Sequence, residues 1–381
     1  MLPSTERLLF GPGPSLVTPR VMRALAAPVL GHLDPQFVTI MDAVRERLAR
    51  VMKAPDGALV LPVSGTGTAG MEAAVANLVE PGKRVLVVVT GYFGLRLVEM
   101  CTRYGGTVSK VEADWGRAID PALVEAHLRT TGADIVAVVH AETSTGVRNP
   151  VPEIAALARA HGALTLVDAV TSLGGQTFDM AAWGVDACYS GTQKCIGAPS
   201  GLAPVAFAPT ALGRRVASRN FYLDLALLED YWVRRKYHHT ISASLVYALA
   251  EALAAIEEEG LEARWGRHAR AHRMFSAAIA AMGMELLPPE AERLMTLATV
   301  RIPAGVNDAA VRTTLRETFN VEIGAGIGPL AGAIWRIGLM GAGATPTSVQ
   351  LLVSALEAVL TRAGHRFTPG AGSAAAQAHG V

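Results

Sequence analysis

The 381-residue chain has few cysteines, almost no net charge and no long apolar run. Its three cysteines, Cys101, Cys188 and Cys195, form neither a CxxC pair nor the ligand spacing of a zinc site, which argues against a disulfide framework and fits a reducing compartment. The formal net charge is +1, and no basic stripe or acidic tail stands out. We therefore expect no nucleic-acid partner.

Signals that would direct the chain to or across a membrane are also lacking. The first residues, MLPSTERLLFGPGP, contain no basic region followed by an apolar stretch, so we predict no signal peptide. The longest apolar runs, such as RVLVVVT at 84–90, have the length of a strand and are too short to span a bilayer. We expect a cytoplasmic protein without a membrane partner.

What the sequence does contain is an alternation of short apolar runs with helical segments. Runs rich in β-branched residues occupy 85–89, 135–140 and 164–168, and helix-like stretches separate them. Buried runs of this kind predict an α/β fold with a mostly parallel sheet covered on both faces. In such sheets the ligand sites lie at the carboxyl ends of the strands.

The pattern changes near residue 245, where SLVYALAEALAAIEEEG predicts a helix that ends at Gly260. Further helices and the strands LATVRIP and AIWRIGL follow, which predicts a smaller α+β domain. We divide the chain into an N-terminal arm (1–18), a large domain (19–258), a small domain (259–366) and a disordered tail (367–381) of small and polar residues.

A glycine-rich segment, LVLPVSGTGTAGMEAAVANLV at 59–79, joins an apolar run to a helix. Gly65, Gly67 and Gly70 match the GxGxxG fingerprint of dinucleotide-binding folds. A dinucleotide also needs an acidic residue at the end of the next strand, but that strand ends in Thr90 and Gly91. An NAD-dependent oxidoreductase is thus a distant alternative, and glycines that serve only tight packing are another.

Hydroxyl groups make a smaller ligand the better match for this loop. Ser64, Thr66 and Thr68 add donors to the backbone N–H groups at the start of a helix, where an anion is already favoured. A compact phosphate monoester would use such a cluster well.

Three other residues indicate which phosphate compound this loop would bind. Asp168 stands at the carboxyl end of an apolar strand, where a carboxylate needs a partner; Lys194 lies in a glycine-flanked loop; Phe93 follows another strand. Taken singly, they could be a helix cap, a solvated lysine and a core residue. Together with the loop they match pyridoxal 5′-phosphate, whose aldehyde condenses with a lysine, whose pyridine nitrogen needs a buried carboxylate and whose ring stacks on an aromatic side chain.

In the order and spacing of its motifs, the chain resembles the class V aminotransferases of fold type I. The motifs are GPGP, GHLDP, SGTGTAGMEAA, HAETSTGVRNP, VDAVTSLGG, YSGTQKCIGAPSG, FYLDL, YHHTIS and RIGLMG, which extend from about residue 10 to about 341. The nearest members are the alanine–glyoxylate and serine–glyoxylate (serine–pyruvate) aminotransferases. The resemblance implies a seven-stranded, mostly parallel sheet in the large domain.

The resemblance also implies a role for each residue of the cofactor site. Lys194 would bind the cofactor covalently and act as the acid–base group, and Asp168 would pair with the pyridine nitrogen. Phe93 takes the position of a stacking aromatic that is often Trp in relatives. The remaining cofactor contacts would be Thr66, Gly67, Thr68 and Gln193 at the phosphate, Thr143 at the phenolic oxygen and Val170 on the ring.

Two further groups of residues follow from the same resemblance. Tyr237 and Thr240 of the YHHT segment would reach the cofactor phosphate of a neighbouring subunit, which makes a homodimer with shared sites. Arg336, in an apolar strand, would hold the substrate carboxylate, which a guanidinium does in bidentate fashion. Gly13 would lie near the substrate entrance.

Adjacent histidines in YHHT diverge and lack a carboxylate set, so no metal site is predicted.

The implied reaction is transamination from alanine or serine to glyoxylate or a similar 2-oxo acid. A ureidoglycine–glyoxylate or other class V aminotransferase is the alternative, although the ureidoglycine enzymes typically carry Asn at the position of Tyr237. Cysteine desulfurases share the fold but need a cysteine on a mobile loop, whereas Cys195 directly follows Lys194. A pocket separates serine from alanine only modestly unless it hydrogen-bonds the hydroxyl, so the donor stays open.

Overall fold

Seven strands form the larger of two main sheets in the computed structural model, which describes residues 7–380. They lie in the order β2-β10-β9-β8-β5-β3-β4; β10 runs antiparallel to β2 and β9, and all other neighbouring pairs are parallel. The predicted mostly parallel sheet is thereby confirmed. The strands are β2 (Leu59–Ser64), β3 (Arg84–Val89), β4 (Thr107–Glu112), β5 (Ile135–Val139), β8 (Leu164–Asp168), β9 (Ala187–Tyr189) and β10 (Leu202–Phe207).

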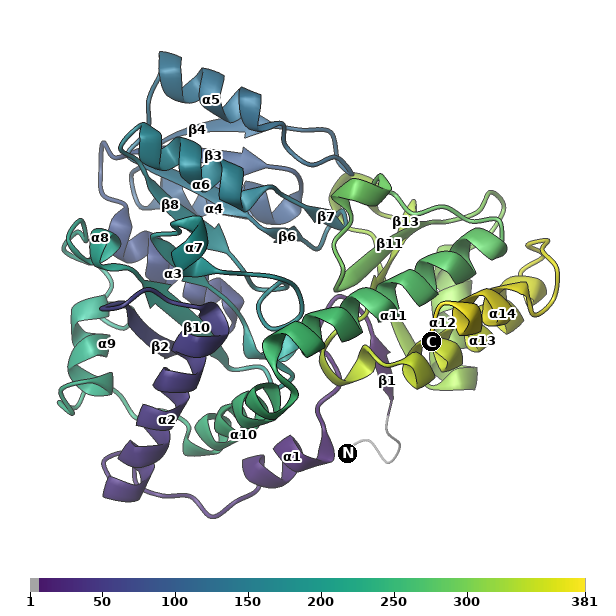
Figure 1. Cartoon of the computed structure of the whole chain (residues 1–381), viewed down its shortest axis with the longest axis horizontal. Helices are drawn as coiled ribbons and strands as arrows, with labels where there is room; N and C mark the ends of the chain where they lie inside the picture. Colours follow the sequence, from purple (N-terminus) through teal and green to yellow (C-terminus); the bar gives the residue numbers. More distant parts are fainter. Residues whose placement is uncertain (1–6, 381) are drawn as a thin grey trace.

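Helices cover both faces of this sheet, as Figure 1 shows. α3 (Gly67–Leu78) and α4 (Tyr92–Arg103) pack on one face, and α5 (Pro121–Thr130), α6 (Val151–Ala160) and α7 (Met180–Trp183) pack on the other. Because β5, β8 and β10 are buried along their whole length, they read in sequence as continuous apolar runs. The remaining helices of this part are α1 (Pro19–Leu25), α2 (Pro35–Met52), α8 (Pro209–Leu212), α9 (Leu225–Trp232) and α10 (Ala243–Glu259).

The second sheet has four strands and its own hydrophobic core. Its order is β1-β12-β13-β11, with β1 (Leu8–Phe10), β11 (Leu297–Arg301), β12 (Val321–Ala325) and β13 (Ile334–Gly338). Around it lie α11 (Leu261–Ala281), α12 (Asp308–Phe319) and α13 (Pro346–Arg362). β1 pairs in parallel with β12, so the start of the described chain completes the sheet of the C-terminal part, which the sequence did not indicate. The boundary at residue 258 stays a prediction.

The end of the chain differs from the disordered tail that we expected. Residues 371–378 form α14 (Ala371–Ala378), which packs against α11 and α13 and buries Ala376 completely. Alanine has the highest helix propensity, and the segment AGSAAAQA contains five alanines. The Glu357 carboxylate accepts bonds from the N–H of Gly372 and the hydroxyl of Ser373, which anchors the start of the helix. Residues 1–6 of the predicted arm and residue 381 lie outside the described part.

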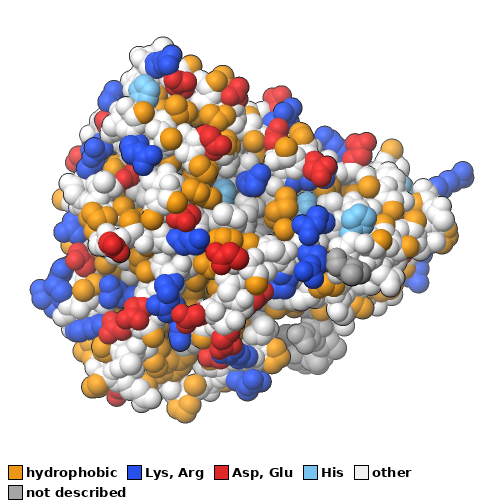
Figure 2. Space-filling view, viewed as in Figure 1, with side chains coloured by type: hydrophobic (Ala, Val, Ile, Leu, Met, Phe, Trp, Pro, Cys, Tyr) orange, Lys and Arg blue, Asp and Glu red, His pale blue; other side chains and the backbone are white. Residues whose placement is uncertain are grey.

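The surface carries charges of both signs in close mixture. On the face drawn in Figure 2, blue Lys and Arg side chains lie next to red Asp and Glu side chains, and many of the basic groups form ion pairs. Within residues 7–380, no helix combines the length and the apolarity that crossing a bilayer requires.

Candidate active site

A pocket lies where the carboxyl ends of five parallel strands meet. β2, β3, β5, β8 and β9 each lead directly into a segment that contributes to its wall. The hollow contains about 530 Å³ of space outside the atoms, part of which is open to solvent. Its lining residues are Thr66, Gly67, Thr68, Met71, Phe93, Arg96, Val139, Ala141, Thr143, Asp168, Val170, Thr171, Gln193 and Lys194.

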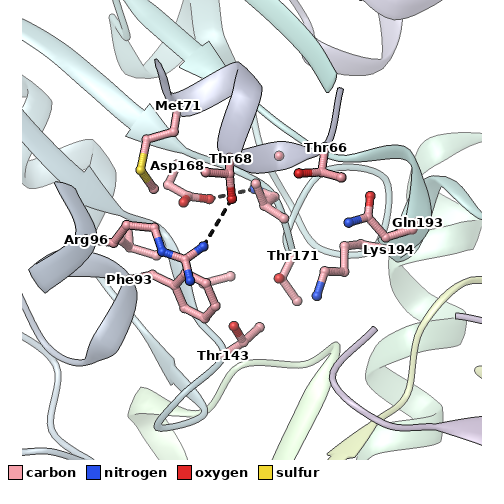
Figure 3. Close-up of a pocket in the computed structure, with 14 residues that line it drawn as sticks. Thr66, Thr68, Met71, Phe93, Arg96, Thr143, Asp168, Thr171, Gln193 and Lys194 are labelled. Carbon is pink, nitrogen blue, oxygen red and sulfur yellow. Dashed lines mark hydrogen bonds between the residues drawn. The ribbon is translucent and has the colours of Figure 1, made fainter. Parts of the chain in front are cut away.

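The pocket thus brings together nine of the residues predicted to contact the cofactor. They are Thr66, Gly67, Thr68, Phe93, Thr143, Asp168, Val170, Gln193 and Lys194. They come from segments that are far apart in the sequence, and Figure 3 shows several of them around one open space, with the Lys194 amine and the Phe93 ring on opposite sides.

The glycine loop turns tightly from β2 into α3. Gly65 has a φ of +141°, which a residue with a side chain rarely adopts. A Cβ on Gly67 would come within 2.8 Å of Val170, so only glycine fits there. Thr66 directly precedes α3 without capping it through its side chain. The hydroxyl is therefore available, beside the backbone N–H groups that begin the helix, to bind an anion.

Lys194 differs in environment from the other lysines. It lies in the π-helical turn η1 (Thr192–Ile196), and its backbone angles are not helical (φ −107°, ψ −129°). Its ammonium donates to the carbonyl of Pro12. Burial, together with the positive charge of Arg336, lowers the pKa of this amine to about 8. A neutral amine, which a nucleophile or a general base must be, is therefore accessible near neutral pH.

Asp168 ends β8 and is buried, with 4% of its surface exposed. Its Oδ1 accepts from the N–H of Val170 at 2.8 Å and its Oδ2 from the hydroxyl of Tyr189 at 2.9 Å. Burial raises the pKa of this carboxyl to about 6, although these two bonds and the positive charge of Lys194 oppose the shift. A carboxylate held like this gains from a cationic ligand such as a protonated ring nitrogen.

An arginine that the sequence analysis missed covers the Phe93 ring. The Arg96 guanidinium carbon lies 4.9 Å from the centroid of that ring, and its Nη1 donates to the Thr68 hydroxyl at 3.1 Å (Figure 3). Arg96 stands one helical turn after Phe93 on α4, a spacing that puts both side chains on one face. This periodicity is the signal by which the sequence could have indicated it.

A buried carboxylate, Glu142, holds the start of α4. It is fully buried and accepts bonds from the N–H groups of Phe93, Gly94 and Ser144 at 3.1–3.2 Å. Burial raises the pKa of Glu142, and its hydrogen bonds oppose the rise. An anion at a helix N-terminus is stabilised by the helix dipole, so Glu142 fixes the turn from which Phe93 projects.

Arg336 lies in the middle of β13 with 9% of its surface exposed. Its Nε donates to the carbonyl of Ala325 at 2.7 Å, and no carboxylate among residues 7–380 forms an ion pair with it. Burial lowers the pKa of the guanidinium, while the negative charge of Glu142 acts in the opposite direction. Arg336 is not among the residues that line the pocket, but its positive charge acts to lower the pKa of Lys194. Such a guanidinium is suited to bind an anionic ligand.

Gly13 lies against the lysine side chain. A Cβ at this position would overlap the Lys194 side chain, with Cδ at 2.7 Å, and the φ of Gly13 is +120°. Any residue other than glycine would therefore displace the lysine. The prediction that Gly13 lies at the substrate entrance stays a prediction.

Tyr237 and Thr240 do not line the pocket of their own chain. Tyr237 is 62% exposed, and its hydroxyl lies 3.4 Å from the Thr240 hydroxyl. The tyrosine ring packs beside His32, and His238 packs beside Phe221, so the segment belongs to an exposed aromatic surface. This chain alone does not bring these two predicted residues to the site.

The cysteines offer no nucleophile. Cys101, Cys188 and Cys195 are fully buried, and burial raises the pKa of each thiol to about 12. A thiolate, the reactive form, is therefore scarce at neutral pH. The Sγ of Cys195 lies 3.3 Å from the carbonyl of Thr171, behind the lysine turn. This arrangement does not support a desulfurase.

Comparison with known proteins agrees with this geometry. The family model described as aminotransferase class-V matches residues 8–333. The chain belongs to the class V aminotransferases. It is 37% identical to the alanine–glyoxylate aminotransferase of Drosophila melanogaster over 92% of this chain and 91% of the relative. The predicted family, fold type and enzyme class are thereby confirmed.

Two solved structures are similar over almost the whole chain. The ureidoglycine–glyoxylate aminotransferase of Bacillus subtilis superposes with a TM-score of 0.96 at 38% identity, covering 99% of both chains. The alanine–glyoxylate aminotransferase of Nostoc sp. gives a TM-score of 0.91 at 44% identity, covering 94% of this chain and 97% of that one. Membership of this family leaves the dinucleotide interpretation of the glycine loop without support.

Proposed function

We propose that the chain transfers an amino group from alanine or serine to glyoxylate with pyridoxal 5′-phosphate as its cofactor. The observation that supports it most is the meeting of Lys194, Asp168 and the hydroxyl-rich helix start in one pocket. Alanine–glyoxylate aminotransferases among the relatives favour the same substrates.

The residues of the pocket fit this cofactor. Asp168 is a buried carboxylate without a cationic partner in direct contact, and the buried Gln193 Oε1 has no hydrogen-bond partner among the described residues. Thr66, Gly67 and Thr68 would hold the phosphate at the start of α3. Val170 and Phe93 would face the two sides of the ring, which requires Arg96 to leave the Phe93 face that it now covers.

When bound, the cofactor supplies an aldehyde that receives the amino group and a ring that withdraws electrons from the substrate Cα–H bond. Residues of the chain itself would move the protons and orient the substrate and the cofactor. Lys194 Nζ would take the proton from the substrate Cα and deliver it to C4′, the carbon of the former aldehyde, and would carry a proton the opposite way when the acceptor is aminated. Asp168 keeps the ring nitrogen protonated. Arg336 orients the substrate through its carboxylate, and Thr143 bonds to the phenolic oxygen.

The second subunit completes the site in this proposal. Tyr237 and Thr240 would reach the phosphate held by the neighbouring chain, because they are exposed and lie outside their own pocket. Two exposed aromatic side chains lie beside His238 of this segment: Phe221 is 73% and Tyr222 is 45% exposed. A twofold dimer would bury this surface. A cytoplasmic location stays part of the proposal.

Ureidoglycine is the second candidate donor, and the Bacillus structure favours it. Steady-state rates with glyoxylate as acceptor and alanine, serine or ureidoglycine as donor decide between them. We expect the highest kcat/KM with alanine or serine. A clearly higher kcat/KM with ureidoglycine would replace the donor, and no transfer from any amino acid would overturn the proposal.

A further inference from the structure

The turn that carries Lys194 is held from behind by a buried arginine of α11. Arg264 is 6% exposed, and its guanidinium donates to the carbonyl oxygens of Cys195 at 2.7 Å and Gly174 at 2.9 Å. Its Nη1 donates to the Glu259 carboxylate at 2.7 Å. Since Cys195 directly follows Lys194, this bond fixes the backbone beside the lysine.

The lysine turn depends on such outside partners because its backbone is irregular. The non-helical angles of Lys194 interrupt η1, so its carbonyl groups are not all paired within the turn. The N–H of Ser15 donates to the carbonyl of Gln193 at 2.8 Å, and the Ser15 hydroxyl donates to the carbonyl of Lys194 at 2.7 Å. The guanidinium bond to Cys195 holds the next carbonyl.

A second arginine of α11, Arg267, contacts the segment after β13. It shares the Glu259 carboxylate with Arg264, which holds the lysine turn. Arg267 donates to the Glu259 carboxylate at 2.6 Å and to the carbonyl groups of Gly341 and Ala344 at 2.8 and 2.9 Å. His268 Nε2 accepts the Gly341 N–H at 3.1 Å. One helix therefore holds both the lysine turn and the chain that follows the strand of Arg336.

We propose that Arg264 is a positioning residue for Lys194, and that Arg267 and Glu259 fix the lysine turn relative to the strand of Arg336. The inference rests on the proposed function, because it takes Lys194 as the group that binds the cofactor. Arg264 does not touch the pocket and acts through the carbonyl of Cys195.

A purely structural role would give a different result from a positioning role. If Arg264 only attached α11 to the rest of the molecule, its loss would lower stability but leave the lysine chemistry of the folded protein intact. If it positions Lys194, the folded protein itself reacts more slowly, because a small misplacement of a reacting group can lower a rate by up to about 100-fold.

The test compares Arg264→Met and Arg264→Lys with two control variants. Arg270→Met changes an exposed arginine of the same helix. Arg84→Met removes an ion pair with Asp134 at the amino end of β3, away from the pocket. The readouts are the rate at which the cofactor-free full chain gains visible absorbance with pyridoxal phosphate, kcat and KM of the loaded enzyme, and the melting temperature.

We expect Arg264→Met to slow loading and lower kcat by about tenfold or more, with KM changed far less. Arg264→Lys should recover part of the loss, because an ammonium can still donate to the Cys195 carbonyl. Arg270→Met should match the wild type, and Arg84→Met should lose stability alone.

Loading and kcat of Arg264→Met equal to those of Arg270→Met would overturn the inference. If Arg264→Met does not fold, Arg264→Lys decides: an intermediate loss supports the inference, and wild-type loading with wild-type kcat refutes it. The proposed function fails separately, since a wild-type protein that gains no visible absorbance would refute that function before any variant is compared.

Discussion

At the scale of single residues, the site depends on how burial changes the charge of a few groups. The chain has five lysines, and the four other than Lys194 all form ion pairs at the surface. Burial lowers the pKa of Lys194 to about 8, whereas burial raises the pKa of Asp168 to about 6. Both shifts favour the neutral form, which is what a low-dielectric pocket does.

From the lowered pKa of Lys194 we predict how the rate of cofactor loading depends on pH. Only the neutral amine can attack an aldehyde, so the loading rate of the cofactor-free protein should rise with pH and level off above about pH 8. A lysine with an ordinary pKa would show a rise that continues to above about pH 10. Stopped-flow measurement of the visible absorbance after mixing with pyridoxal phosphate checks this, and a rate still rising steeply at the higher pH contradicts it.

The raised pKa of Asp168 predicts opposite effects of Asp168→Asn on stability and on binding. An acid whose pKa is higher in the folded state destabilises the fold once the pH exceeds its unfolded pKa, and the loss grows until the folded pKa is passed. At neutral pH the ionised Asp168 should therefore cost the cofactor-free protein on the order of 2–3 kcal/mol. Asp168→Asn should raise the melting temperature of that form yet weaken cofactor retention.

Calorimetry and cofactor titration test these two effects together. A variant whose cofactor-free form melts earlier, while the cofactor binds as tightly as before, would show that Asp168 serves the fold and not the ligand. Glu99→Gln, an exposed acidic position on α4, provides the comparison.

At the scale of elements, the start of α4 combines a buried anion with the aromatic face of the pocket. Glu142→Gln would place an amide donor against the backbone N–H groups of Phe93, Gly94 and Ser144. Buried donors left without an acceptor typically cost about 1–3 kcal/mol. We expect a fall in the free energy of unfolding of that size, measured by urea denaturation. An unchanged free energy would show that Glu142 does not hold the helix.

Some of the strands and site residues could be predicted from the sequence, and others could not. β5 and β8 were visible as apolar runs, and Asp168, Lys194 and Phe93 were found because strand ends and glycine-flanked loops are local signals. Five of the named cofactor contacts came only from the family resemblance: Thr143, Val170, Gln193, Tyr237 and Thr240. Glu142 was missed, because a buried carboxylate on a short strand has no periodic pattern of its own.

Other features could not be predicted because they depend on contacts between parts of the chain that are far apart in sequence. β1 exists only by pairing with β12, more than three hundred residues later in the chain, and three residues carry no usable pattern. α14 was expected to be disordered from its small residues, but its alanines favour a helix and α11 and α13 provide a surface to pack on. Arg264 acts through a backbone carbonyl, so nothing in its neighbours along the chain indicates its contact.

At the scale of the whole molecule, the shared site can be tested by exchanging subunits. Lys194→Ala should be inactive alone, and the double variant Tyr237→Phe with Thr240→Val should hold the cofactor weakly. A mixed dimer would contain one intact site, formed by the lysine of one chain and the Tyr237 and Thr240 of the other. Mixing should therefore restore roughly a quarter of the wild-type sites at random exchange.

The control is the same pair of proteins assayed without subunit exchange. Activity that stays at the mean of the two separate variants, although mixed dimers are shown to form, would mean that each chain completes its own site.

The central claim is that Lys194 binds the cofactor, and one measurement tests it directly. The purified protein is loaded with pyridoxal phosphate, reduced with borohydride to make the link permanent, digested and analysed by mass spectrometry. We predict a pyridoxyl-phosphate adduct on the peptide that contains Lys194 and on none of the four peptides with the other lysines. An adduct on a surface lysine alone, or no adduct at all, would contradict the account.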